Sequence, residues 1–337
     1  MIEWEKLPFG YMPTNANIRC KYTNGAWGNI EIHHSETLEL HMSATCLHYG
    51  QECFEGLKAY RGKDEKIRLF RWEENSKRLN ESAKRIGMPE IPKEIFKESL
   101  LKLISLNQEF VPPYGSGASM YIRPLIIGTE AKLGLSASVE NLFVLFCSPV
   151  GPYFKTGFKP VKVVIERHTD RAAPQGTGHV KVGGNYAAAL NTTLEATKKG
   201  YSAALFLDPK EKKYIDECGP ANFFGIKNNT YITPKSSSIL PSITNMSLID
   251  LASHLGMKVE RRPVELTEIE TFEEVGQCGT AAVLTPIYCI ADLDNKKEFI
   301  FGDSDTPGKQ SQKLYETLVG IQFGDIPDPF NWITIVE

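Results

Sequence analysis

A single lysine, Lys181, lies in a glycine-rich segment directly before an alanine-rich stretch, within GTGHVKVGGNYAAAL. Val180 and Val182 flank it, and apolar surroundings favour the neutral amine, the form of lysine that attacks carbonyl carbons and forms Schiff bases. The alternative is a solvated loop lysine, which is the common state of lysines in proteins. A phosphate-binding loop is excluded because valine follows Lys181 where that pattern requires Ser or Thr.

Two adjacent acids, Asp216 and Glu217, lie in the strand-like sequence YIDECG. Neighbouring side chains of a strand point to opposite faces, so we expect at most one of them to face inward. A buried carboxylate would need a cationic partner, whereas an ordinary edge-strand acid would remain in solvent.

Two further stretches have the composition of anion-binding sites. Residues 240–252 are a Ser/Thr-rich turn that leads into a helix, and residues 276–286 place a glycine-flanked threonine before an apolar strand. Both can present backbone N–H groups to a phosphate, although a Ser or Thr at this place is commonly just a helix cap. Arg78 lies beside Leu79 on an apolar helical stripe, where its planar group either binds a phosphate or lets its stem cover the helix.

The helices and strands that position these candidate residues can be predicted from the sequence. Apolar periodicity and the residues that end helices predict helices over 73–86, from Pro92 through 95–106, over 186–199 and 247–255, after Thr267 and over 309–319. Apolar, strand-favouring runs predict strands over 120–127, 141–147, 161–167 and 203–208.

The order of these elements predicts an α+β or mixed α/β fold in two domains, because helices and strands neither segregate nor alternate strictly. Prolines and glycines interrupt the pattern over 148–160, which is typical of an interdomain connection. We therefore predict a small N-terminal domain over 1–147, an interdomain loop over 148–160 and a larger domain over 161–337.

Composition narrows the class of protein. The 337 residues carry 38 basic and 41 acidic side chains, a net charge of −3 that argues against a nucleic-acid partner. Seven scattered cysteines argue against structural zinc and a disulfide framework, so no metal is expected. The N-terminus lacks a signal-peptide pattern, and the apolar run 142–147 is far shorter than the ~18 residues of a membrane span. These features predict a soluble, cytoplasmic protein.

The sequence resembles the branched-chain amino acid aminotransferases, which are pyridoxal-phosphate (PLP) enzymes of fold type IV. The resemblance implies a smaller N-terminal α+β domain, a larger C-terminal pseudo-barrel domain, and a homodimer with its active site near the subunit interface. The matching motifs follow the family's order and cover nearly the whole chain: LHYG with CFEGLKAYRG (47–62), RLFRWEENSKRLNESAKR (68–85), YIRPLIIGTEAKLG (121–134), SPVGPYF (148–154), KVGGNYAAAL (181–190), IDECG with NFF (215–224), LPSIT (240–244) and GTAAVLTP (279–286).

The resemblance assigns a role to each candidate cofactor residue. It implies that Lys181 carries PLP as a Schiff base and that Glu217 pairs with the pyridinium nitrogen, which keeps the ring an electron sink. Tyr186 would hydrogen-bond the phenolic oxygen of the cofactor. The phosphate would be held by Arg78, by the amides of Ile243 and Thr244, and by Thr280.

The resemblance also implies a substrate pocket for leucine, isoleucine or valine, with 2-oxoglutarate and glutamate as the second pair. Its apolar and tyrosine-lined wall would comprise Phe54, Tyr121 and Tyr153, with Tyr49 reaching over from a second subunit. The α-carboxylate would meet the amides of Thr280 and Ala281 and the Tyr121 hydroxyl, and Arg123 would bind the distal carboxylate of glutamate. The reaction would follow ping-pong kinetics.

Three positions depart from the commoner pattern of the family. Ser242 stands where glycine is usual and Asn245 where arginine is frequent, so phosphate binding would depend more on Arg78. Ala221 replaces a glutamate of some bacterial members, which would alter the hydrogen bonding around Arg123.

Two other interpretations remain open from the sequence. Other fold-type IV enzymes, such as a D-amino acid aminotransferase or an aminodeoxychorismate lyase, share the lysine and the glutamate. A small-molecule binding protein without catalysis would use the same anion sites as a ligand pocket.

Overall fold

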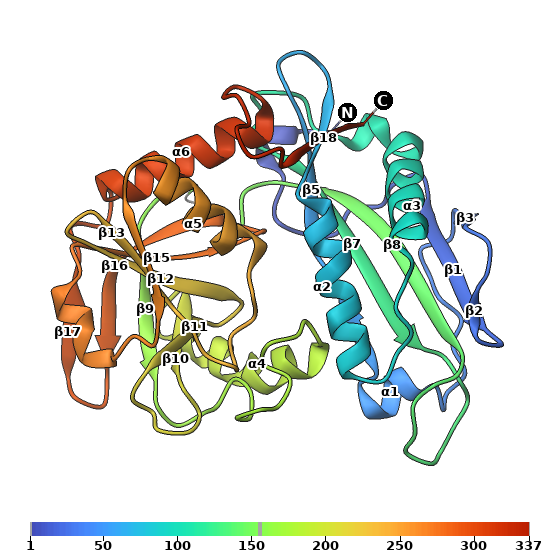
Figure 1. Ribbon diagram of the computed structural model, residues 1–337, viewed down its shortest axis with the longest axis horizontal. Coiled ribbons are helices and arrows are strands. Elements are labelled where there is room, and N and C mark those ends of the chain that lie inside the picture. Colours follow the sequence, from blue (N-terminus) through green and yellow to red (C-terminus); the bar gives the residue numbers. More distant parts are fainter. Residues whose placement is uncertain (1, 154–156, 337) are drawn as a thin grey trace. The chain divides into compact units, whose positions relative to one another are not determined.

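The computed structural model describes residues 2–153 and 157–336 and divides the chain into two compact units (Figure 1). Unit 1 comprises Met1–Tyr153, Val180–Gly183 and Gly320–Glu337, and unit 2 comprises Phe154–His179 and Gly184–Val319. Residues 154–156 of the expected interdomain loop, and with them Phe154 of the SPVGPYF motif, lie outside the described residues. The domain boundary at 148–160 stays a prediction.

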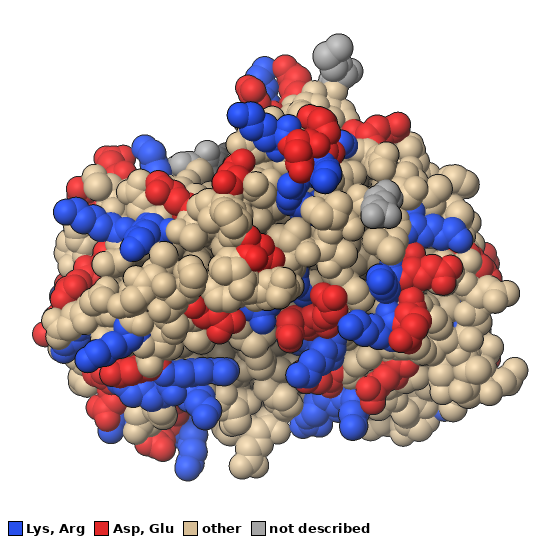
Figure 2. Space-filling view, turned by 45° about the horizontal axis from the view of Figure 1, so that its top comes forward, with Lys and Arg blue, Asp and Glu red and all other residues tan. Residues whose placement is uncertain are grey.

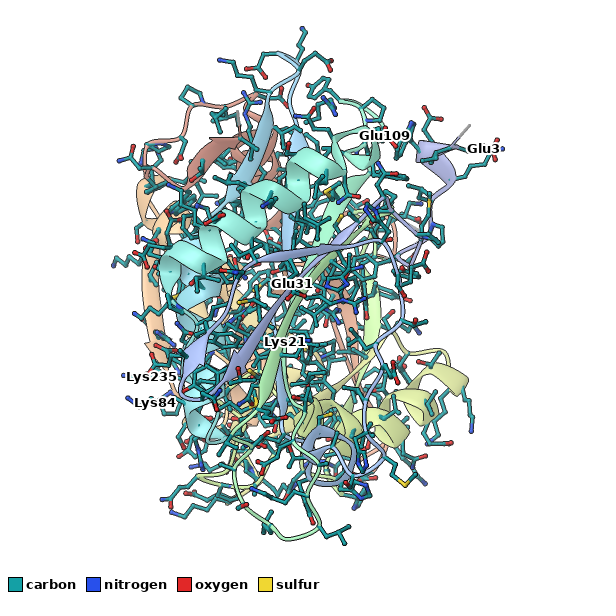
Figure 3. The ribbon with its side chains drawn as sticks, turned by 90° about the vertical axis from the view of Figure 1, so that its right-hand side faces the viewer. Glu3, Lys21, Glu31, Lys84, Glu109 and Lys235 are labelled. Atoms are coloured by element: carbon teal, nitrogen blue, oxygen red, sulfur yellow. The ribbon has the colours of Figure 1, made fainter. Side chains whose placement is uncertain are left out.

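Unit 1 is built on an antiparallel sheet with the strand order β18-β6-β5-β7-β8-β1-β2, in which β3 pairs with β1 and β4 pairs with β7. The C-terminal tail belongs to this unit rather than continuing the second domain, because β18 pairs with β6. Figure 3 labels Lys21 on β1 and Glu31 on β3, two neighbouring strands of this sheet. The strands are β1 (Asn17–Thr23), β2 (Ala26–Trp27), β3 (Glu31–His33), β4 (Glu52–Phe54), β5 (Leu57–Arg61), β6 (Ile67–Phe70), β7 (Ser119–Gly128), β8 (Asn141–Val150) and β18 (Ile333–Val336).

Two helices share one core with this sheet, which confirms the first two predicted helices: α2 (Trp72–Arg85) and α3 (Lys93–Leu106). Acids in the first turn of α2, bases in its last turn and Gly87 in a left-handed conformation define where that helix starts and stops. The core takes Trp72, Leu79 and Ala83 from α2, four apolar side chains from α3, and every second residue of the strands. Alternation along β7 therefore turns Tyr121 and Arg123 to the opposite face of the sheet.

Unit 2 contains a closed ring of strands. Its sheet runs β11-β10-β9-β16-β15-β12-β13-β14, and a further pairing of β11 with β12 closes the ring β11-β10-β9-β16-β15-β12 into a barrel. A barrel leaves no open edge in those strands. The strands are β9 (Val161–Glu166), β10 (Ala203–Leu207), β11 (Ile215–Cys218), β12 (Ala221–Lys227), β13 (Thr230–Pro234), β14 (Lys258–Arg262), β15 (Glu274–Gly279), β16 (Val283–Asp292) and β17 (Lys297–Ile300).

The helices of unit 2 agree with the predictions in three cases and differ in one. The helices α4 (Gly183–Lys198), α5 (Ile243–His254) and α6 (Lys309–Phe323) are present, each longer than or shifted from its predicted range. The helix predicted after Thr267 is wrong. That stretch is a single 3-10 segment, Leu266–Thr271, closed by a capping box between Glu265 and Glu268, and six residues are too few for a stable α-helix.

The seven cysteines are free thiols, and six of them are buried or belong to strands. No helix within residues 2–153 and 157–336 combines the length and the apolar character needed to cross a bilayer. On the face drawn in Figure 2, basic and acidic side chains are interspersed.

Candidate active site

Lys181 has its main chain fixed on both sides within unit 1. Its N–H donates to Ser82 Oγ of α2 at 2.9 Å, and its carbonyl accepts from the N–H of Phe54 at 3.1 Å. Val182 forms a bridge with Cys53, and the buried side chains of Val180 and Val182 belong to the core of the unit. The half-buried lysine is therefore held against β4 and α2, not carried on a free loop.

Lys181 and Arg123 approach the same aromatic ring. The Lys181 Nζ and the Arg123 Cζ each lie 4.8 Å from the centre of the Phe54 ring. Arg123 Nη2 donates to the Tyr121 hydroxyl at 3.2 Å, and Arg123 Nε is buried with no hydrogen-bond partner among the described residues. Four of the predicted site residues, Lys181, Phe54, Tyr121 and Arg123, thus come together on the face of the sheet that is turned away from the core.

A glycine gives Tyr121 its place on this face. A Cβ built on Gly56 would overlap the Tyr121 hydroxyl oxygen, so no larger residue fits there while the tyrosine keeps its position. Phe9, which the sequence did not single out, makes edge-on contacts with Tyr121 and Tyr153 at ring distances of 5.3 and 5.2 Å. The two tyrosines predicted for the pocket wall therefore share one aromatic neighbour.

Arg78 forms a buried ion pair in unit 1. Its Nε and Nη2 donate to the two carboxylate oxygens of Glu55 at 2.6 and 2.9 Å, and Glu55 is completely buried. Asn75 donates to the same carboxylate at 2.7 Å. The two parallel hydrogen bonds to Glu55 fix the orientation of the Arg78 guanidinium.

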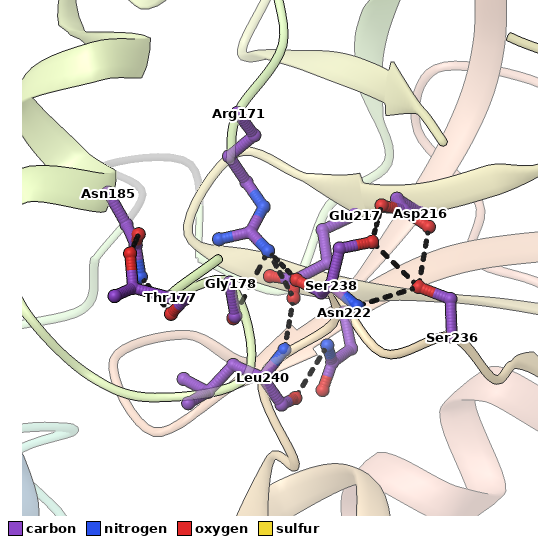
Figure 4. Close-up of polar contacts among 10 residues, drawn as sticks. All are labelled: Arg171, Thr177, Gly178, Asn185, Asp216, Glu217, Asn222, Ser236, Ser238 and Leu240. Carbon is purple, nitrogen blue, oxygen red and sulfur yellow. Dashed lines mark hydrogen bonds and ion pairs between the residues drawn. The ribbon is translucent and has the colours of Figure 1, made fainter. Parts of the chain in front are cut away.

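Glu217 is the centre of a polar network in unit 2 (Figure 4). The side chain of Glu217 is 3% exposed, lies 3.3 Å from Arg171 Nη2 and accepts a hydrogen bond from the Leu240 N–H at 2.5 Å. Arg171 also donates to the carbonyls of Gly178 and Ser238. Arg171 is thus the cationic partner that a buried Glu217 requires within the barrel.

The expectation that at most one of the two adjacent acids faces inward is wrong. Asp216 and Glu217 point to opposite faces of β11, yet both are buried. Asp216 is covered by the turn after β13, where Ser236 and Ser238 donate to its two oxygens at 3.0 and 2.6 Å. Burial raises the pKa of Asp216, and these two hydroxyl donors together with Arg171 act in the opposite direction.

The predicted phosphate-binding turn is the beginning of α5. Ser242 is its N-cap and accepts from the Asn245 N–H at 3.2 Å, which leaves Ile243 and Thr244 in the first turn with buried side chains. The side chain of Asn245 bonds Tyr231 and Thr233, both on β13. Asn245 therefore has a structural role in joining α5 to β13, where an arginine would bring a charge.

Thr280 and Ala281 lie in the tight turn that joins β15 to β16. The turn ends on Val283, whose φ of +63° is a strained conformation for a β-branched residue. Such strain persists only where the surrounding structure imposes it, and it is common at ligand-binding sites. Tyr186 lies half-buried in the first turns of α4.

Sequence reasoning missed several residues that contact the predicted ones. Ser82, Glu55 and Arg171 are the nearest examples, since each orients a predicted residue through a bond made by side chains or backbone distant in sequence. Strand alternation could have found Lys58 and Glu52, because the strand register places both on the face that carries Tyr121 and Arg123.

Comparison with known proteins identifies the class. Residues 52–290 match the family model described as amino-transferase class IV. The chain belongs to this family, and it is a pyridoxal-phosphate-dependent aminotransferase of the branched-chain type.

Two curated relatives and one solved structure illustrate the likeness. The branched-chain-amino-acid aminotransferase of Haemophilus influenzae is 44% identical over 343 residues, covering 100% of this chain and 99% of the relative. That of Helicobacter pylori is 46% identical over 335 residues, covering 98% and 97%. The crystal structure of the branched-chain amino acid aminotransferase of Escherichia coli is 26% identical, covers 96% of this chain and 100% of that chain, and has a TM-score of 0.77.

Proposed function

We propose that this chain transfers the amino group of leucine, isoleucine or valine to 2-oxoglutarate, giving the branched 2-oxo acid and glutamate in a ping-pong reaction on one PLP. The observation that carries the proposal is the shared contact of Lys181 and Arg123 with Phe54. A reactive amine and a group that binds carboxylates then lie beside one apolar surface. An aliphatic side chain can pack on that surface, and a glutamate side chain can extend to Arg123.

Polar residues around Glu217 in unit 2 fit PLP as the cofactor. In the described part of unit 2, Arg171 Nε and Asn222 Oδ1 are buried without a hydrogen-bond partner, and β12 places Asn222 directly opposite Glu217. Buried polar atoms without partners are rare in folded proteins, and a polar ring ligand would supply them. Glu217 would hold the ring nitrogen and Tyr186 the phenolic oxygen, while the α5 start, Thr280 and Arg78 would hold the phosphate.

PLP supplies an electron sink that makes the Cα–H bond of a bound amino acid acidic. Lys181 would accept the proton from Cα as general base and deliver it as general acid to the C4′ position within the same half of the reaction, and the second half would run these two transfers in reverse. The hydrogen bond from its N–H to Ser82 and the buried valines on either side hold the main chain of Lys181 beside Phe54. Tyr121 and the amides of Thr280 and Ala281 orient the α-carboxylate, which selects the hydrogen that faces Lys181.

We further propose that the enzyme is a homodimer in which Tyr49 contributes to the partner's substrate pocket. Tyr49 is 40% exposed at the end of α1 (Thr45–Tyr49), and its hydroxyl donates to the carbonyl of Leu133. The same part of unit 1 exposes large apolar side chains, which is the composition of a surface covered in an assembly: Met42, Leu47, Leu133, Leu135 and Val139. We place the reaction in the cytoplasm, in keeping with seven free thiols.

Replacing the lysine tests the function. Wild type should absorb as a yellow enzyme, lose that colour on borohydride treatment with modification of one lysine, and transaminate L-leucine with 2-oxoglutarate. Lys181→Ala should reduce turnover to the rate in buffer, because both proton transfers lose their base. Lys162→Ala is the matched control, since Lys162 also lies over an aromatic ring, that of Tyr288, and should keep full activity.

Full turnover by Lys181→Ala would refute the proposal. A donor panel separates the other interpretations: turnover of D-amino acids in preference to L-leucine would indicate a D-amino acid aminotransferase. Binding of leucine without any turnover in wild type would indicate a binding protein.

A further inference from the structure

Glu52 is an acid on the face of the unit 1 sheet that carries Tyr121 and Arg123, and the proposed function assigns it no role. It lies on β4 two residues before Phe54, and its carboxylate accepts a hydrogen bond from the N–H of Gly183, with which α4 begins. The fit is tight, because a Cβ built on Gly183 would overlap Glu52 Oε1. Glu52 therefore bonds the segment that carries Lys181 two residues after the N–H that donates to Ser82.

The strand register puts Glu52 and Arg123 on one face. Glu52 pairs with Ile127 and Phe54 pairs with Leu125, so the side chains of β4 at 52 and 54 share a face with those of β7 at 121, 123, 125 and 127. Lys58 on β5 pairs with Tyr121 and joins the same face. On this face of β4, β5 and β7, all of which the structure describes, the cations are Lys58 and Arg123 and the acid is Glu52. Lys181 also approaches this face, over the ring of Phe54.

We propose that Glu52 is a specificity-determining positioning residue that balances the charge of Arg123, so that one pocket accepts both aliphatic and dicarboxylate substrates. This inference rests on the proposed function. When leucine binds, no substrate carboxylate reaches Arg123, and Glu52 supplies the negative charge that a part-buried guanidinium needs. When glutamate binds, its distal carboxylate competes with Glu52 for Arg123 and loses part of its binding energy to the repulsion between the two acids.

The electrostatic setting of Glu52 supports this role. Burial raises the pKa of Glu52, and the hydrogen bond from Gly183 and the charge of Arg123 both lower it. Arg123 is the ionisable side chain among these causes, which is the effect expected of a cation on the same face of the sheet.

Two substitutions separate the charge of Glu52 from its hydrogen bond. Glu52→Gln keeps an oxygen for the Gly183 N–H but removes the charge, whereas Glu52→Asp keeps the charge and shortens the reach to Gly183. If charge balance is the role, Glu52→Gln should lower the ratio of kcat/KM for leucine to kcat/KM for glutamate about ten-fold, as expected for losing one part-buried charge interaction. Most of that change should be in KM, and Glu52→Asp should stay within about three-fold of the wild-type ratio.

Equilibrium binding gives a readout that needs no turnover. In calorimetric titrations of the holoenzyme, Glu52→Gln should bind 2-oxoglutarate more tightly and 4-methyl-2-oxopentanoate more weakly than wild type. Glu274→Gln is the matched control, because Glu274 likewise accepts hydrogen bonds from backbone N–H groups at the start of a helix, those of Gln310 and Ser311 in α6. This substitution should change neither the affinity for 2-oxoglutarate nor that for 4-methyl-2-oxopentanoate.

An unchanged ratio in Glu52→Gln would overturn the proposal. So would an equal loss for both substrates, or a change in Glu52→Asp as large as that in Glu52→Gln, since both outcomes indicate a purely structural role through Gly183. If wild type fails to transaminate leucine, the proposed function fails. The affinities of wild type and Glu52→Gln for 2-oxoglutarate and 4-methyl-2-oxopentanoate still decide whether Glu52 balances the charge of Arg123.

Discussion

Replacing Arg171 tests the proposal that Glu217 pairs with the protonated ring nitrogen of PLP. Arg171 Nη2 lies 3.3 Å from Glu217, and both side chains are less than 10% exposed. Arg171→Met keeps an unbranched apolar stem in the same space but leaves the carboxylate in the barrel without its cationic partner.

Breaking one partner of a buried ion pair costs ~3 to 5 kcal/mol. The Leu240 N–H still donates to Glu217 at 2.5 Å in the variant, so we expect a loss near the lower end, ~3 kcal/mol. For a domain of roughly 150 to 250 residues, each kcal/mol lowers Tm by ~2 to 4 °C, so the apoenzyme should melt ~6 to 12 °C lower than wild type.

Cofactor binding should restore part of this loss. A protonated ring nitrogen gives Glu217 a new cationic partner, so the rise in Tm on adding PLP should be larger in Arg171→Met than in wild type. Thermal unfolding of both proteins with and without PLP measures the two differences.

Arg167→Met is the control for this experiment. Arg167 pairs with Asp292 at 2.5 Å, and Asp292 is 5% exposed, but neither residue belongs to the proposed cofactor site. This variant should be destabilised while keeping the wild-type response to PLP. Equal responses to PLP in the wild type and both variants would refute the assignment of Glu217 to the ring nitrogen.

The remaining predictions concern a loop and the subunit interface. Burial raises the pKa of Asp208, but the N–H donors of Tyr214, Glu211 and Lys213 outweigh it and hold that pKa below its usual value. The stabilisation is therefore present above the unfolded pKa of ~3.9 and is lost as the pH falls through the lower, folded pKa. Asp208→Asn should cost ~1 to 3 kcal/mol at pH 7 and progressively less as the pH falls below ~3.9, measured by urea unfolding; a cost that does not change with pH would contradict this reasoning. Leu133→Asp places a charge in the exposed apolar surface and should convert a dimer to a monomer in analytical ultracentrifugation, and a monomeric wild type would contradict the dimer.

Local sequence signals predicted the helices and central strands of the fold. The apolar spacing of Leu79 and Ala83 and the stop at Gly87 suffice for α2, since helix periodicity and capping depend on residues within a few positions. The same locality explains the error after Thr267, where a capping box imitates a helix start but the segment ends after six residues.

Local sequence signals could not predict which strands pair when the strands are distant in sequence. That β18 joins β6, and that β11 closes the barrel on β12, depends on contacts whose partners no local pattern specifies. The same limit explains the error at Asp216, because its cover comes from Ser236 and Ser238, about twenty residues further along. Lys181, Glu217 and Arg78 stood out in the sequence itself, and the resemblance supplied the other candidate residues. Their partners Ser82 and Arg171 meet them through contacts that no local pattern specifies.

The way in which Lys181 is held has a consequence for the chemistry. Residues 180–183 cluster with unit 1, while the chain before and after them belongs to unit 2. Ser82, Phe54 and Glu52 therefore fix the lysine segment to the unit that carries Tyr121 and Arg123. A displacement of that unit's sheet would carry the proposed general base together with the residues proposed to select the substrate. A base that keeps its place relative to the substrate side chain can accept leucine and glutamate alike, because only the far end of the pocket has to distinguish an apolar group from a carboxylate.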